Sequence, residues 1–197
     1  MRSDTQIGMG NQGPQMDAKR FEVAARNADG AAAVVVAGDI VNEWDNQEYV
    51  DLAERALALF DAPQGIHLTS GVHLVPGNHD IDSHAATAEI FREQLAHFRN
   101  TFGVDYHSFT TEHATFVMIN SESLIATENH PDFGSGDIHH ALAVQEEADA
   151  QWKWLESTLA EAAAGPKPHI LPVMHHPPFL NFPTEEAQYF NWPPIAR

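Results

Sequence analysis

The stretch AAAVVVAGDIVN, residues 31–42, decides the fold. Residues 31–37 are an uninterrupted run of small and apolar side chains, which is typical of a strand buried on both faces. Strands of this kind belong to sheets covered by other layers on both sides, as in α/β proteins. Gly38 and Asp39 follow the run directly, so a sharp turn at the glycine delivers a carboxylate to the end of the strand.

Hydrophobic periodicity predicts alternating helices and strands along the rest of the chain. Asp17 is expected to cap a helix that stops at Gly30. The remaining pattern predicts helices at 49–60, 83–100 and 145–164. It predicts strands at 72–75, 106–109, 115–119 and 169–174. Residues 126–143 are rich in Gly, Asp, His and Asn and predict a long loop. The fold class is therefore α/β with a partly mixed sheet.

Length and charge limit the kinds of partner. The 197 residues suit a single domain, 1–197. Ten Lys and Arg stand against 28 Asp and Glu, which gives a formal net charge of −18. Because binding to a nucleic-acid backbone needs a positive patch, we expect no nucleic-acid partner. No apolar run approaches the roughly 20 residues of a membrane span, so we expect no membrane partner. The oligomeric state is not indicated.

The chain contains no cysteine, which excludes disulfides and thiolate metal sites. The first residues, Met-Arg-Ser-Asp, lack the apolar core of a signal peptide. We expect a cytoplasmic protein, and a leader lost from the start of the sequence would reverse that expectation. The 13 histidines are conspicuous because imidazole serves in metal binding and in proton transfer.

Three polar clusters each follow a predicted strand directly. They are Gly-Asp-Ile-Val-Asn at 38–42, Gly-Asn-His-Asp at 77–80 and His-His-Pro-Pro at 175–178. Ligands of α/β sheets bind beyond the carboxyl ends of the strands, so we expect these clusters to meet at one edge. A carboxylate, an amide oxygen and an imidazole together make a ligand set for Mn, Fe, Zn or similar ions.

These motifs resemble those of the calcineurin-like metallophosphoesterases. The resemblance is carried by Gly38-Asp39-x-x-Asn42, Gly77-Asn78-His79-Asp80 and His175 in that order, and it extends over essentially the whole chain. The D-x-Q start at residues 4–6 and the H-x-P-x-F segment at 175–179 are similar to the subgroup near calcineurin-like phosphoesterase domain-containing protein 1. The resemblance implies a four-layer α/β/β/α sandwich.

The same resemblance implies two divalent metal ions (Mn, Fe or Zn) that hold a bridging hydroxide for attack on phosphorus. Asp39 would bridge the two ions. Asp4 and Gln6 would bind the first ion, and Asn78 and His175 would bind the second. Two ions placed in this way also neutralise charge that develops on the phosphoryl oxygens.

Two further residues are expected to act in catalysis. His79 would lie beside the phosphate and protonate the leaving oxygen or stabilise the transition state. Asp80 would orient His79 or close the turn rather than bind metal. The family's terminal Gly-His-x-His is absent, a glutamine replaces the first-motif histidine, and no apolar strand precedes Asp4. We therefore expect a sandwich that is incomplete at both ends.

Each assignment has a purely structural alternative. Asp39 can serve as a turn residue or a helix cap, and Asn78 and His79 can belong to a tight turn. Gln6 can support a ligand without binding metal itself. Ligation by His175 rather than by the adjacent His176 follows the family pattern alone.

The predicted function is metal-dependent hydrolysis of a phosphomonoester, either a small phosphorylated substrate or a phosphoprotein. A phosphodiesterase acting on nucleotides or phospholipid head groups is the first alternative. A non-catalytic metal-binding module, or an inactive fragment, is the second. The sequence identifies neither the natural substrate nor the metal.

Overall fold

The computed structural model describes residues 5–60, 66–82, 87–125 and 138–176. The first half alternates helices and strands: α1 (Pro14–Arg26), β1 (Val34–Ala37), α2 (Gln47–Leu57) with the short 3-10 helix η1 (Ala58–Phe60), β2 (Val72–Val75) and α3 (Ala88–Thr101). The second half contains β3 (His107–Thr110), β4 (Ala114–Met118), α4 (Ser121–Ile125), α5 (Ile138–Ala164) and β5 (His169–Val173). The predicted α/β class is confirmed.

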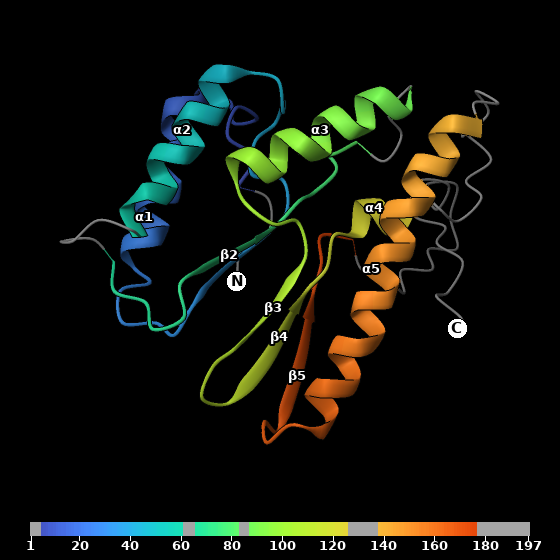
Figure 1. The fold of residues 1–197 in the computed structure, drawn as a ribbon. Coiled ribbons are helices and arrows are strands. Elements are labelled where there is room, and N and C mark those ends of the chain that lie inside the picture. The colour runs from blue at the N-terminus through green and yellow to red at the C-terminus, as the bar shows by residue number, and fades with distance from the viewer. Residues whose placement is uncertain (1–4, 61–65, 83–86, 126–137, 177–197) are drawn as a thin grey trace, which may run out of the picture.

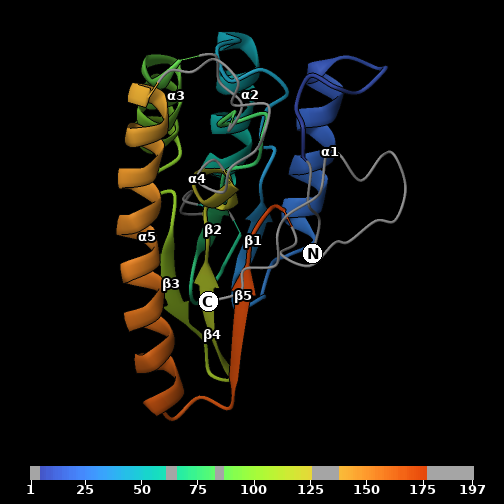
Figure 2. The same ribbon diagram turned by 90° about the vertical axis from the view of Figure 1, so that its right-hand side faces the viewer.

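The strands of the described residues form two sheets (Figures 1 and 2). In the first sheet β1 pairs with β2 in parallel, with Val34 opposite Val72. In the second sheet β4 lies between β3, to which it is antiparallel, and β5, to which it is parallel. The mixed sheet predicted from the hairpin pattern is therefore present. Because β1, β2 and β5 belong to parallel pairs, their carboxyl ends supply the edge at which ligands bind in such folds.

Apolar side chains fill the spaces between four layers in the order α/β/β/α. The cluster under α1, α2 and α3 includes Phe21, Leu52 and Phe91 with Val36 and Leu74 of the first sheet. A second cluster joins the two sheets, and a third lies between the second sheet and α5. Figures 1 and 2 show α5 on the side of the molecule opposite α1 and α2. The predicted layer order is confirmed.

The position of β1 between two layers explains its unbroken apolar sequence. Successive side chains of a strand point to opposite faces. Val34 and Val36 pack against the helices, whereas Val35 and Ala37 pack toward the second sheet. Both faces of β1 are covered, fully at Val36 and Ala37 and partly at Val34 and Val35, so the strand carries no polar residue before Gly38.

Two local predictions are wrong. Asp17 does not cap α1, because that helix already begins at Pro14 with Gly13 as its N-cap, and proline is favoured in the first helical turn. The Asp17 carboxylate instead accepts backbone N–H groups from Gly8 and Gly10. The loop predicted over 126–143 is also too long. Helix α5 already begins at Ile138, where the turn-forming residues give way to a run rich in Ala and Leu.

Among the described residues, no helix combines the length and the apolar composition that crossing a bilayer requires.

Candidate metal centre and active site

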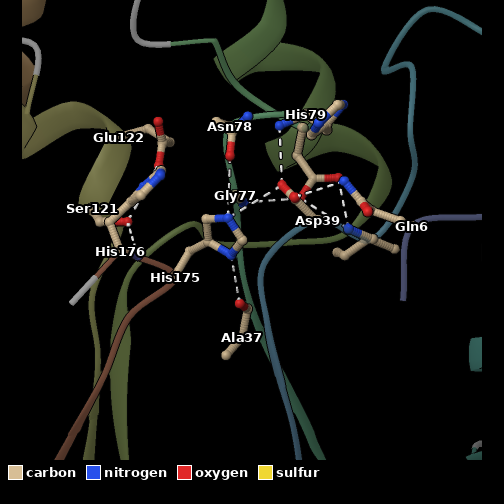
Figure 3. Close-up of polar contacts among 12 residues, drawn as sticks. Gln6, Ala37, Asp39, Gly77, Asn78, His79, Ser121, Glu122, His175 and His176 are labelled. Carbon is tan, nitrogen blue, oxygen red and sulfur yellow. Dashed lines mark hydrogen bonds and ion pairs between the residues drawn. The ribbon is translucent and has the colours of Figure 1, made fainter. Parts of the chain in front are cut away.

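Side chains from the ends of β1, β2 and β5 converge in one place (Figure 3). Nε2 of His175 lies 3.2 Å from Asn78 Oδ1 and 3.5 Å from Asp39 Oδ1. The backbone N–H of His79 donates to Asp39 Oδ1 at 3.0 Å. The three polar clusters that the sequence predicts at strand ends therefore do meet at one edge of the sheets.

Asp39 occupies a left-handed backbone conformation with φ of 50°. Among the described residues only Gln6 shares a positive φ without being a glycine. Such a conformation costs energy for a residue with a Cβ, and it is found where the surrounding structure and function require it. Asp39 is only 4% exposed, and its two oxygens accept from His79 N and from Nε2 of Gln6. The carboxylate is thus held in one orientation.

Two glycines permit the close packing around this carboxylate. A side chain at Gly38, where φ is 88°, would collide with the imidazole of His175. A side chain at Gly77 would collide with the Asp39 carboxylate and backbone nitrogen. Both positions therefore need glycine for the clusters to approach one another.

The hydrogen bond of the other His175 nitrogen determines which atom faces the site. Nδ1 lies 2.9 Å from the carbonyl oxygen of Ala37, and a carbonyl only accepts, so Nδ1 carries a proton. Nε2 is then the atom directed at Asn78 and Asp39. An imidazole nitrogen, an amide oxygen and a carboxylate oxygen facing one another favour a positive charge between them. The donor set fits a divalent cation of the Mn, Fe or Zn type.

The amide of Asn78 is essential to this donor set. No group of three His, Asp or Glu side chains suited to a metal occurs within the part of the chain that the structure describes. Asp39 and His175 would supply two ligands of that kind, and the side-chain oxygen of Asn78 would supply a third. Asn78 is exposed, so the site opens to solvent.

Gln6 lies beside Asp39, with its amide nitrogen rather than its amide oxygen toward the carboxylate. Nε2 donates to Asp39 Oδ2 at 3.0 Å. This contact corresponds to the supporting alternative for Gln6, and metal ligation by its oxygen stays a prediction. The predicted ligand Asp4 lies outside the described residues.

The His79 ring is fixed by a backbone carbonyl. Nδ1 lies 2.8 Å from the carbonyl oxygen of Asn42 and therefore donates to it. Nε2 remains as the ring nitrogen that can hold or release a proton at the site. Asn42, which the sequence placed within a loop, thus contributes through its main chain.

Asp80 joins the two motif loops. Its carboxylate, in a residue only 2% exposed, accepts N–H groups from Ile40, Val41 and Gly77 at 2.9–3.2 Å. Burial raises the pKa of Asp80 to about 7, against the opposite effect of these three donors. The contacts correspond to the turn-closing alternative, and a role of Asp80 in catalysis stays a prediction.

Comparison with known proteins agrees with this geometry. The family model for calcineurin-like phosphoesterases matches residues 3–197. The chain belongs to the calcineurin-like phosphoesterase family. The resemblance read from the motifs is therefore confirmed, and family members generally use a dinuclear metal centre.

The chain is also similar to curated members of this calcineurin-like family named serine/threonine-protein phosphatase CPPED1. It is 32% identical to that protein of Rattus norvegicus over 162 residues and 30% identical to that of Mus musculus over 162 residues. It is 28% identical to that of Danio rerio over 158 residues. Each match covers 80% of this chain but only 44% of the relative, so the chain spans less than half the length of these relatives.

The sequence analysis did not single out one buried acidic group beside this candidate site. Glu122, in α4, is fully buried, and its Oε1 lies 2.6 Å from Nδ1 of His176. Glu122 stands next to Ser121, shortly after the end of β4. An acidic residue at that position was the available signal.

Proposed function

We propose that this chain is a metal-dependent phosphoesterase that hydrolyses phosphomonoesters, with phosphoserine and phosphothreonine proteins as its natural substrate class. The observation that carries the proposal is the convergence of Asp39, Asn78 and His175 around one point, with His79 alongside. Hydrolysis of a phosphate ester needs positioned positive charge and a proton donor more than covalent chemistry from the protein.

Asp39, Asn78 and His175 are the described residues that would hold a metal ion. A divalent ion there supplies Lewis acidity that offsets the negative charge developing on the phosphoryl oxygens. Asp39 is suited to the task because Gln6 and the His79 backbone fix both of its oxygens. His175 is suited because Ala37 holds its Nδ1 proton and so leaves Nε2 as the donor atom.

His79 supplies the proton for the leaving group in this proposal. Its Nδ1–H donates to the Asn42 carbonyl, so the proton that is transferred is the one at Nε2. Positioning of this kind by a backbone carbonyl fixes both the tautomer and the ring orientation of a histidine. The ester oxygen would receive that proton as its bond to phosphorus breaks and would leave as an alcohol, while the oxygen of a water molecule forms the new bond to phosphorus.

The substrate class is supported by the relatives, which are named serine/threonine-protein phosphatases. The net charge of −18 disfavours large anionic polymers as substrates, because they would be repelled from the molecule. Manganese, iron and zinc all suit the donor set, and we propose manganese as the first ion to test.

The test is hydrolysis of p-nitrophenyl phosphate with and without added manganese, in the wild-type chain and in Asp39→Asn. Asparagine is a better replacement than alanine, because it tolerates the left-handed backbone at φ of 50° and keeps one oxygen. We expect manganese-dependent turnover in the wild type and a loss of about a hundredfold or more in Asp39→Asn, in line with the effect of removing electrostatic stabilisation of the transition state.

Asp17→Asn is the matched control. Asp17 is also a buried aspartate that accepts backbone N–H groups, but its contacts are with Gly8, Gly10 and Arg20 rather than with the site. Its turnover should stay close to that of the wild type. Equal activity in Asp39→Asn and the wild type would refute the assignment, and faster hydrolysis of bis-p-nitrophenyl phosphate would favour the phosphodiesterase alternative.

A further inference from the structure

Glu122 is a buried acid for which the proposed reaction gives no direct task. It has no exposed surface, and Oε1 contacts Nδ1 of His176 at 2.6 Å and the hydroxyl of Ser121 at 3.3 Å. Oε2 is buried and has no hydrogen-bond partner among the described residues. A buried carboxylate is costly unless it is paired, so the contact with His176 is the main compensation that the described residues provide.

The same short helix also holds the backbone of residue 176. The His176 N–H donates to Ser121 Oγ at 3.2 Å, while the His176 ring contacts Glu122 (Figure 3). Ser121 therefore holds the main chain of His176, and Glu122 holds its side chain. The two partners of the ring contact are 54 residues apart in sequence and meet because β4 and β5 are parallel neighbours.

The base of α4 is itself rigid. Asn120 and Gln151 have no exposed surface, and each donates to the other at 2.8–2.9 Å. Asn120 also donates to Asp105 at 2.9 Å. These hydrogen bonds fix the position of Glu122, and a carboxylate held in one position can orient the imidazole that it contacts.

Glu122 contacts His176, which is next to the proposed metal ligand His175. The rings of His175 and His176 lie edge to face, with centroids 4.7 Å apart and planes at 84°. Met118 pairs with Val173 at the end of β5. Beyond that strand His175 contacts Ala37, Asn78 and Asp39, and His176 contacts Ser121 and Glu122.

We propose that Glu122 is a positioning residue that acts through His176 to hold His175 in its metal-binding orientation. This inference rests on the proposed function, because it takes His175 to be a metal ligand. Outer contacts of this kind fix the orientation of a ligating histidine, and their loss weakens metal affinity.

The test is manganese binding to the 197-residue chain, measured by calorimetric titration, which needs no activity. Glu122→Met fills a similar volume but accepts nothing from His176. It should weaken manganese binding about tenfold, the lower end of what such outer contacts contribute. Glu122→Gln keeps an acceptor for Nδ1–H and should stay within about threefold of the wild type.

A double variant tests whether Glu122 acts through His176. His176→Phe should weaken manganese binding as much as Glu122→Met does, and the double variant should be no weaker than either single variant. Additive losses would overturn the inference. Should Glu122→Met fail to fold, Glu122→Gln and His176→Phe still carry the comparison, together with the His175 ring resonances of the metal-free chain, which should shift in His176→Phe.

Two controls separate this inference from the proposed function. Asp17→Asn changes another buried carboxylate, which contacts Gly8, Gly10 and Arg20 rather than α4, His175 or His176, and it should leave manganese affinity unchanged. His175→Ala should lose manganese binding. If it binds manganese as the wild type does, or if the wild type binds none, both the metal site and this inference fail. If only the Glu122 and His176 variants bind normally, the inference alone fails.

Discussion

Left-handed backbone at Gly38 and Asp39 turns the chain at the end of β1 and directs the carboxylate into the site. Glycine adopts this conformation without penalty, whereas a residue such as aspartate is strained in it by about 1–3 kcal/mol. Contacts from Gln6 and His79 to the Asp39 oxygens hold the strained residue in place. The cost at a single residue is therefore compensated by contacts that also define the site.

Replacing Gly38 by alanine should separate backbone strain from steric conflict. Gly38 and Gly30 have similar φ values, 88° and 82°, but only Gly38 would bring a Cβ against His175, whereas nothing lies within 4 Å of a Cβ at Gly30. Gly30→Ala should cost about 1–2 kcal/mol of unfolding free energy from strain alone. Gly38→Ala should cost about 2–5 kcal/mol and also weaken manganese binding. Urea unfolding and calorimetry measure both, and equal costs at the two positions would contradict the packing argument.

Asp80→Asn should destabilise the chain although the two side chains have nearly the same shape. The carboxylate accepts from three backbone N–H groups, and an amide would present its own N–H to one of them. We expect a loss of about 1–3 kcal/mol in chemical unfolding, the cost of an unsatisfied buried group. Asp51→Asn, at an exposed position in α2, is the matched control and should be close to neutral.

At the scale of elements, a pair of histidines joins β2 of the first sheet to β3 of the second. His73 Nδ1 and His107 Nε2 lie 2.9 Å apart, and the His73 ring stacks on Phe109. Burial lowers the pKa of both imidazoles below the ordinary 6.5. For His107 the neighbouring His73 lowers the pKa further and Asp105 opposes this, and for His73 the Ser70 carbonyl opposes burial. The neutral pair is therefore the form that packs between the sheets.

This pair makes the stability of the fold depend on pH. Because the pKa of both rings is lower in the folded state than the unfolded value of 6.5, the unfolded chain binds more protons as the pH falls below 6.5. Stability should be highest above that pH and should decrease on acidification. Thermal unfolding between pH 7 and pH 5 should show a smaller decrease for His107→Phe than for the wild type. His113→Gln changes a histidine with an 80% exposed side chain and should behave as the wild type; equal slopes in all three would contradict the role of the pair.

At the scale of the whole molecule, the site joins parts that otherwise belong to different sheets. Asp39 and Asn78 follow strands of the first sheet, and His175 follows β5 of the second. A metal ion held by all three would link the sheets at their carboxyl ends. Binding to the folded state alone stabilises it by mass action.

Manganese should therefore raise the melting temperature of the chain. At about one hundred times Kd the gain is roughly 2.7 kcal/mol. In a chain of this size that corresponds to an increase of about 5–11 °C. A chelator should reverse the increase, and His175→Ala should abolish it while retaining the metal-free melting temperature within a few degrees. A shift that persists in His175→Ala would place the ion elsewhere.

Local sequence was sufficient to predict most helices and strands and the edge of the sheets at which the motifs meet. The strand at 72–75 and the α/β class followed from periodicity, and the shared edge followed from polar residues at strand ends. Helix ends were less predictable. Gly13 and Pro14 rather than Asp17 start α1, because several residues near a helix start can satisfy its N–H groups and only packing decides among them.

The sequence by itself determined which polar residues meet at the ends of the strands, namely Asp39, Asn78, His79 and His175, because both the motifs and the strand ends are features of local sequence. The tertiary structure alone decided how the surrounding groups are used. It directed the Gln6 amide nitrogen to Asp39, the Asp80 carboxylate to backbone amides 39–40 residues away, and the buried Glu122 to His176. The physical reason is that the packing of whole layers decides which groups distant in sequence become hydrogen-bond partners. The hydrophobic periodicity of a single helix or strand does not specify these partners.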